Sequence, residues 1–348
     1  MILKKCVKGC FTVLSLIALI ALGVNLVQAA DLEDKVVVYS THPESLLELV
    51  ADAFTKETGV KVDFINLKGE LADRVRAEKA NPQSDVMYGA PSSVFQELKK
   101  EGLFEAFSPS WADRIDPLFK DPEAFWFGTI KTPVVMFYNS EMIAADKAPK
   151  DWSELAQPAY QGLLVFRNAL SSSARAAYTS LLQQYERKND LDAGWKFLKA
   201  LDANTKRYYD SGSLLFQAIG RKEAALSFAV LNDVIDNKIQ NKMPLEIIDA
   251  ASGSPVITDG IALIKNAKRP NAGKAFVDFA GGAKVQAMLA DKFNRLPTHP
   301  DAIAASPPWM GEIRFKVMDV DWSALAAKQS EWMQYWDTDI KDSAKDKK

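Results

Sequence analysis

The chain has 348 residues, of which 48% are hydrophobic and 25% charged, with 43 basic and 45 acidic side chains and a formal net charge of −2. This is the composition of an ordinary globular protein. The slight acidic excess gives the chain no bulk electrostatic reason to bind nucleic acid or an anionic membrane, so we expect no nucleic-acid partner.

The N-terminal segment has the features of a secretory signal peptide in the usual order. Three lysines precede an apolar run, Phe11–Val24, and Val27-Gln28-Ala29 then supplies the small residues that signal peptidase recognises. The alternative is a membrane anchor, but a run of about 14 residues is shorter than the about 20 that a spanning helix needs. We predict that residues 1–29 are removed and that the mature protein is a soluble periplasmic monomer.

The predicted signal peptide also contains both cysteines of the chain, Cys6 and Cys10. The mature protein would therefore have no disulfide, no thiolate nucleophile and no cysteine-ligated metal. Loss of the three lysines would change the formal net charge from −2 to −5. The remaining residues, about 318, exceed what one hydrophobic core usually holds, and two lobes are expected.

The mature chain opens with strand, polar turn and helix, three times in succession. This alternation predicts a parallel sheet covered by helices, in which ligands bind at the carboxyl ends of the strands. Thr41 with Glu44 three residues later predicts a capping box at the first helix. The predicted strands are Lys35–Tyr39, Val60–Ile65 and Asp85–Tyr88, and the helices cover 46–55, 71–79 and 94–101.

A long extended segment, Trp126–Asn139, is expected to cross to a second lobe built in the same way. The chain then returns to the first lobe through 259–264. Further strands are predicted at 162–166, 224–230 and 245–248, and helices at 171–185, 193–201, 214–219, 271–280 and 283–291.

The predicted fold class is α/β, with two lobes whose mixed, mainly parallel sheets are joined by crossing strands. We assign residues 30–130 and 250–300 to the first lobe. Residues 131–249 and 301–340 form the second lobe with the C-terminal helices, and 341–348 are predicted to be a flexible tail.

Five short motifs carry a resemblance to a known family. They are Val37–Ser40, Phe54–Gly59, Asn81–Val86, Trp152–Pro158 with Gly162, and Ala275–Phe279 before Gly281. In this order they resemble the periplasmic substrate-binding proteins of ABC importers, in the branch that binds ferric ion, phosphonates, phosphoglycerate and hexose phosphates. The resemblance implies the type II two-lobed fold, a cleft that closes on its ligand, and a membrane permease with its ATPase as partners. It implies neither catalysis nor a cofactor.

Ferric iron is the alternative ligand in this branch. The resemblance implies adjacent tyrosines after a second-lobe strand, with a histidine and a glutamate, but residues 224–233 contain no tyrosine. Gly89-Ala90 stands at the place of the glutamate, and His42 is one residue away from the histidine position. Tyr208-Tyr209 lies upstream, where a strand edge is expected. We therefore predict no metal site.

An anionic ligand fits the sequence better, and an organophosphate or phosphonate is favoured. Serine-rich turns follow several predicted strands, and helix N-termini with small hydroxyl residues bind oxyanions. Ordinary N-capping is the alternative explanation for each serine. The candidate residues in these turns are Ser40, Thr41, Ser92, Ser171, Ser173, Ser211, Gly212, Ser213, Ser252 and Ser254.

Charged and polar residues complete the candidate ligand site. Arg167 follows a predicted strand, and its guanidinium can hold an oxyanion through two hydrogen bonds; Lys68 is a second candidate cation. Asp233 could pair with an amino group of the ligand. The other candidates are His42, Ala90 and Asn232.

An exported hydrolase is the alternative from another functional class. A serine nucleophile needs a base and an orienting acid, but the chain has two histidines and no Gly-x-Ser-x-Gly elbow. We therefore predict a binding protein with no catalytic residues.

Overall fold

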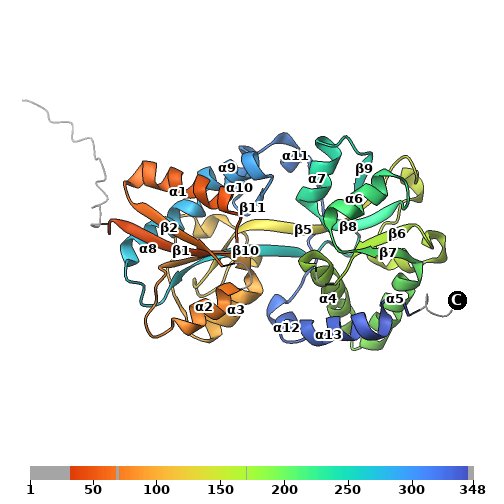
Figure 1. The fold of residues 1–348 in the computed structure, drawn as a ribbon, viewed down its shortest axis with the longest axis horizontal. Coiled ribbons are helices and arrows are strands. Elements are labelled where there is room, and N and C mark those ends of the chain that lie inside the picture. The colour runs from red at the N-terminus through yellow and green to blue at the C-terminus, as the bar shows by residue number, and fades with distance from the viewer. Residues whose placement is uncertain (1–31, 68–69, 170, 344–348) are drawn as a thin grey trace, which may run out of the picture.

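The computed structural model describes residues 32–67, 70–169 and 171–343, so the predicted signal peptide and the candidate ligand residue Lys68 lie outside the described part. Figure 1 shows two α/β lobes side by side, connected in the middle by the strands β5 (Phe127–Asn139) and β10 (Val256–Ile264). The predicted α/β two-lobed fold is confirmed. None of the described helices is long and apolar enough to cross a membrane.

The first lobe has helices on both faces of its sheet. Side chains of the parallel strand β1 (Lys35–Ser40) alternate between the two faces of the sheet. Val36 and Val38 pack towards α1 (Glu44–Thr58) and α8 (Pro270–Ala280), and Tyr39 packs towards α2 (Leu71–Ala77) and α3 (Ser92–Lys100). The other elements are β2 (Lys61–Asn66), β3 (Val86–Pro91), β4 (Phe104–Glu105) and α9 (Ala283–Phe293).

The predicted capping box at the first helix is wrong. Pro43 is the N-cap of α1, and no side chain caps the helix. The backbone carbonyl of Pro43 accepts hydrogen bonds from the N–H groups of Leu46 and Leu47 in the first turn of the helix. One turn earlier in the chain, the Oγ of Ser40 accepts the backbone N–H of His42 at 3.0 Å. The turn after β1 is therefore held by a serine that belongs to the strand.

Strand β5 belongs to both lobes. Its first half, Phe127–Pro133, pairs antiparallel with β10, and its second half, from Val134, pairs with β8 (Leu226–Val230) and β9 (Leu245–Ile248). In the second half, Met136 faces one core of the second lobe, and Val135 and Phe137 face the other. Because both faces are covered, this stretch is a continuous apolar run, and the predicted crossing segment is confirmed.

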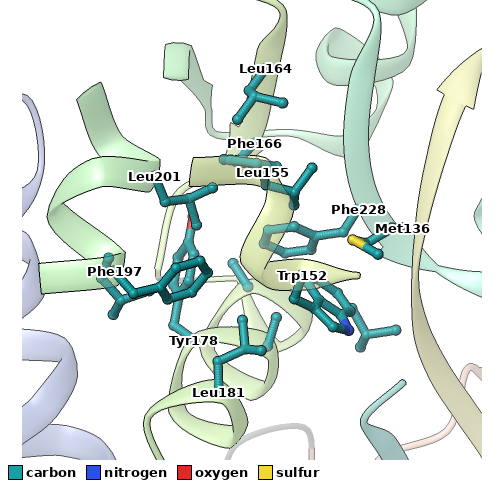
Figure 2. Packing of buried hydrophobic residues seen from close by; sticks show 14 of the residues in the cluster. Met136, Trp152, Leu155, Leu164, Phe166, Tyr178, Leu181, Phe197, Leu201 and Phe228 are labelled. Atoms are coloured by element: carbon teal, nitrogen blue, oxygen red, sulfur yellow. The ribbon is translucent and has the colours of Figure 1, made fainter. Parts of the chain in front are cut away.

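The second lobe repeats the layered design. Figure 2 shows the core on one face of its sheet, where the rings of Phe166 and Phe228 stack with their centroids 4.7 Å apart. Trp152, a buried member of the same core, donates from Nε1 to the carbonyl of Gly253 at 2.8 Å. The remaining elements are β6 (Leu164–Arg167), β7 (Thr205–Tyr209), α4 (Ser172–Glu186), α5 (Leu191–Asn204), α6 (Gly212–Gly220) and α7 (Leu231–Ile239).

The C-terminal segment packs on the core of the second lobe. Trp336 is 1% exposed and stacks on Tyr178 with ring centroids 4.9 Å apart. Beyond it, the N–H of Asp342 donates to Asp202 at 3.0 Å. The elements are β11 (Leu296–Pro297), α10 (Pro300–Ala304), α11 (Pro308–Glu312), α12 (Trp322–Ala326), α13 (Gln329–Tyr335) and the π-turn Trp336–Ile340. The residue at which each lobe begins and ends stays a prediction.

Substitution of Trp336 tests whether the C-terminal segment stabilises the second lobe. We expect Trp336→Ala to lower the free energy of unfolding by about 3–5 kcal/mol, because it leaves a large cavity against Tyr178. Urea unfolding followed by far-ultraviolet circular dichroism measures the change. The neighbouring Tyr335, which is 38% exposed, is the matched control, and Tyr335→Ala should cost much less. Equal costs would show that the segment packs differently.

Candidate ligand-binding site

Arg295 connects the polar groups of the two lobes. Its charge acts on the pKa values of His42, Tyr88 and Asp259 in the first lobe and of Asp233 in the second. Its guanidinium is therefore close enough to titratable groups of both lobes to influence them electrostatically.

The local sequence around Arg295 explains its position. Asn294 ends α9 in the left-handed conformation with φ 51°, and Leu296 then joins the sheet by pairing with Lys131 of β5. Arg295 is thus fixed between a helix end and a crossing strand. Among the described residues it forms no ion pair, and its buried Nε has no hydrogen-bond partner.

The first-lobe wall is formed where β1 and β3 end. His42 is 4% exposed and meets the Tyr88 ring edge-on, with centroids 4.7 Å apart. Burial lowers the pKa of His42 to about 3, and the charge of Arg295 adds to this effect, so the imidazole is neutral. Its buried Nε2 has no partner in the described part of the chain.

The last residues of β3 include a glycine that is needed because they lie against the turn after β1. Gly89 has φ +93°, and a Cβ there would stand 3.0 Å from both Nε2 of His42 and Oγ1 of Thr41. Ala90 follows with φ 77°, which is unusual for a residue with a side chain. Ser40, Thr41, His42 and Ala90, four of the predicted ligand residues, are thus brought together.

Asp259 lies at an irregularity of β10. The register with β5 shifts between Asp259 and Gly260, and such bulges redirect side chains next to binding sites. Burial raises the pKa of Asp259 to about 6, while Arg295 acts in the opposite direction. Because the carboxylate is harder to charge in the folded protein than in the unfolded chain, it reduces stability as the pH rises from about 4 to about 6.

Arg167 forms the second-lobe side of the site together with the start of α6. Its Nη2 donates to the carbonyl of Asp210 at 2.9 Å, and its Nη1 would be 3.4 Å from a Cβ on Gly212. The guanidinium therefore lies over the first turn of the helix. Ser211 acts as the N-cap, since its Oγ accepts the N–H of Leu214 at 3.2 Å.

A pocket of about 650 Å³ opens beside Arg167. Asp233, near the start of α7, contributes a carboxylate to it, and Asn232 donates to that carboxylate at 2.9 Å. Burial and the neighbouring Asp236 raise the pKa of Asp233, while Arg295 and Arg167 oppose the rise. The lining residues are Arg167, Gly212, Ser213, Phe216, Gln217, Gly220, Asp233, Asp236, Asn237, Asn241 and Met243.

One hydrogen bond crosses between the lobes next to this pocket. Nδ2 of Asn294 donates to Oδ1 of Asp236 at 2.6 Å. It links the end of α9 to α7, so the residue before Arg295 is held against the second lobe.

The N-terminus of α4 supplies two more of the predicted residues. Ser171 is the N-cap but makes no side-chain capping bond, and its Oγ lies 2.9 Å from the Oγ of Ser173. Arg175 lies one helical turn after Ser171, and its backbone N–H donates to the carbonyl of Ser171. The two hydroxyls are thus paired with each other at the helix start, where an oxyanion would be favoured.

Other candidate residues have structural contacts elsewhere. Ser252 bonds to Asp151 through both its N–H and its Oγ, at 3.1 and 2.5 Å. Ser254 is fully buried and its N–H donates to the carbonyl of Lys316. Both hold the turn between β9 and β10 against neighbouring segments.

Tyr208 and Tyr209, the adjacent tyrosines considered for the alternative ferric-iron ligand, lie inside the second lobe. Tyr208 donates to Asp202 at 2.7 Å and packs against Trp336, and Tyr209 is buried. Within the described residues, no three His, Cys, Asp or Glu side chains lie close enough to hold a metal ion.

Comparison with known proteins identifies the class. The model of the bacterial extracellular solute-binding protein family matches residues 81–323, and the chain belongs to this family. It is 31% identical over 316 residues to a probable ABC transporter periplasmic-binding protein of Sinorhizobium fredii, covering 89% of this chain and 87% of the relative. The protein is therefore a periplasmic solute-binding protein of an ABC transporter, and the predicted resemblance is confirmed.

Relatives with named ligands differ among themselves. Iron uptake protein A1 of Synechocystis is 24% identical, with 74% of each chain covered. A putative 2-aminoethylphosphonate-binding periplasmic protein of Salmonella typhimurium is also 24% identical, with 82% of this chain and 81% of the relative covered.

Solved structures share the fold. The fructose-6-phosphate-bound periplasmic binding protein AfuA of Actinobacillus pleuropneumoniae matches with a TM-score of 0.68 and 25% identity, over 88% of this chain and 98% of that one. The apo ferric ion-binding protein A of Pasteurella haemolytica matches with a TM-score of 0.74 and 21% identity, over 88% and 97%.

Removal of the Arg295 charge should raise the pKa of Asp259. We expect Arg295→Gln to move that pKa above its value of about 6, because the nearby positive charge that favours the carboxylate is lost. Side-chain carboxyl ¹³C chemical shifts, followed through a pH titration, measure it. Arg207→Gln, at an exposed arginine of β7, is the control and should leave the titration unchanged. An unchanged or lower pKa in Arg295→Gln would contradict the placement of Arg295.

Proposed function

We propose that this protein captures a small solute carrying a phosphoryl or phosphonyl group between its lobes and delivers it to a membrane permease and its ATPase. The observation that carries the proposal is a pair of arginines, Arg167 from the second lobe and Arg295 from the first. Both have a buried Nε without a hydrogen-bond partner, and neither forms an ion pair within the described residues.

Guanidinium groups whose buried Nε lacks a partner favour an oxyanion ligand. A buried donor left without a partner costs free energy, and an arginine can satisfy its donors by binding a phosphoryl oxygen pair. The carboxylate of Asp233 is close enough to both arginines to be influenced by their charge. It offers an acceptor for an amino or hydroxyl group on the same solute.

Hinge closure follows from the placement of the two cations on different lobes. An anion bound between Arg167 and Arg295 would contact both lobes only when they are near each other, so it would favour the closed form. The strands β5 and β10 connect the lobes and would form the hinge for such bending. The closed, liganded form is the one that would dock on the permease.

The hydrogen bonds of the two histidines support a binding protein rather than a hydrolase. His299 accepts the N–H of Asp301 through Nδ1, and Nε2 of His42 has no hydrogen-bond partner among the described residues. Neither imidazole, in the described structure, activates a hydroxyl as a general base would.

The named ligands of relatives support an organophosphate or phosphonate. One relative is named for 2-aminoethylphosphonate, and one structural neighbour holds fructose-6-phosphate. Iron is named for others, but here the tyrosine pair is engaged in the core of the second lobe.

A thermal-shift panel tests the proposed solute class. The mature protein is unfolded and refolded to remove bound ligand, then mixed with phosphonates, sugar phosphates, phosphoglycerates or ferric citrate. A ligand at a hundred times its Kd adds about 2.7 kcal/mol, which raises the melting temperature by several degrees. We expect a shift with phosphorylated or phosphonate compounds. A shift with ferric citrate alone would overturn the proposal.

Charge-removing variants then test the two arginines. With a phosphorylated or phosphonate compound that shifts the wild type, Arg167→Gln and Arg295→Gln should each weaken binding by roughly tenfold or more, because charge-assisted hydrogen bonds are lost. Isothermal titration calorimetry gives the affinities, and Arg207→Gln is the matched control. Wild-type affinity in both variants would show that the anion binds elsewhere.

A further inference from the structure

A second pocket lies between the lobes, and it shares no lining residue with the pocket beside Arg167. We call it the α12 pocket. Its volume is about 310 Å³, and the first lobe contributes the start of α3 while the second contributes α4, α12 and α13. The lining residues are Pro91, Ser92, Ser93, Val94, Arg175, Ala176, Ile257, Trp322, Leu325, Ala326 and Gln329.

The polar side of the α12 pocket is suited to an acidic group. Arg175 has a buried Nε without a partner and forms no ion pair within the described residues. Ser92 is 5% exposed, and its hydroxyl makes no hydrogen bond there. Ser92 begins α3, a helix of nine residues whose N-cap, Pro91, provides no side-chain bond. A helix start without a side-chain cap, a hydroxyl and a cation therefore line one pocket.

The opposite side of the pocket is apolar. Ile257 comes from β10, and Trp322, Leu325 and Ala326 come from α12. Leu325 is also part of the second-lobe core, which fixes α12 in place. An occupant that filled this side would bury apolar surface, at roughly 25 cal/mol per Å².

We propose that the α12 pocket binds an amphipathic organic acid, with its acidic group at Arg175 and Ser92 and its apolar body against Trp322. Ser92, a candidate ligand residue from the sequence, lines this pocket and not the pocket beside Arg167, and the proposal does not depend on the identity of the solute. Because residues of both lobes line the pocket, its occupant favours the lobe arrangement in which Ser92 and Arg175 face each other.

Phenylbutyrate is a suitable probe, because it carries one carboxylate on an aromatic body. The uncharged analogue phenylbutanol has nearly the same body and tests the need for the acid. Calorimetric titration of the wild-type mature protein should show the acid binding roughly tenfold more tightly than the alcohol, since a charge-assisted hydrogen bond is worth about that much.

Two variants locate the binding. Arg175→Gln should remove the preference for the acid over the alcohol. Ala326→Leu adds bulk to the apolar wall without removing a polar group, and it should weaken both probes. Circular dichroism and the melting temperature confirm that each variant is folded, and the second variant keeps the test valid should the first be unstable.

The variant Arg167→Gln distinguishes binding in the α12 pocket from binding at the proposed solute site. It should leave phenylbutyrate binding unchanged, while Arg207→Gln reports on nonspecific charge effects. The proposal is overturned by equal binding of acid and alcohol to the wild type, or by loss of phenylbutyrate binding in Arg167→Gln with retention in Arg175→Gln.

Discussion

Strand β5 is shared by the two lobes, and this sharing sets the geometry of everything between them. Half of the strand pairs with β10 in one lobe and half with β8 and β9 in the other. Pro133 lies at the change of partner, and the next amide, of Val134, donates to the carbonyl of Pro255 at 2.8 Å. One continuous strand therefore belongs to the sheets of both lobes. Polar residues at the strand ends that border the gap between the lobes come close together in space, although they are far apart in the sequence.

Arg295 determines the charge balance of that space. The site contains the carboxylates Asp233 and Asp259, whose pKa values burial raises, and the cations Arg167 and Arg295. The carboxylates are costly to ionise there, whereas arginine stays charged at any pH that the protein meets. As the carboxylates take up protons the local charge becomes more positive, so the arginines control the preference for an anion.

The sequence predicts the lobes well because their elements are local patterns. The strand-turn-helix units and the crossing segment 126–139 could be recognised from apolar runs and turn residues, and the structure places them close to the predicted bounds. The capping box failed because α1 begins at Glu44 after the N-cap Pro43, so Thr41 and Glu44 do not occupy the N-cap and N3 positions that the motif requires. A local motif is a weak guide where neighbouring residues offer another hydrogen-bond pattern.

The candidate site was only partly predictable, because it depends on contacts across the chain. Arg167 was proposed because it stands at the end of a predicted strand, and Asp233 because of its place in the family resemblance; both line the pocket of about 650 Å³. Arg295 follows a helix, and nothing in its local sequence marks it as part of the site; only the pairing of Leu296 with β5 brings it there. Arg175 lies inside a helix, where an arginine is normally taken for a surface residue.

The C-terminal segment adds a constraint that the lobes alone would not have. Helix α12 is anchored in the core of the second lobe through Leu325, yet Ser323 on the same helix accepts a hydrogen bond from Lys100 of α3 at 2.8 Å. A second inter-lobe hydrogen bond joins Asn294 to Asp236. Bending about β5 and β10 must therefore shift polar contacts in two places. The free energy of closure depends on these contacts as well as on the ligand, since a ligand changes the equilibrium only by its difference in affinity for the two forms.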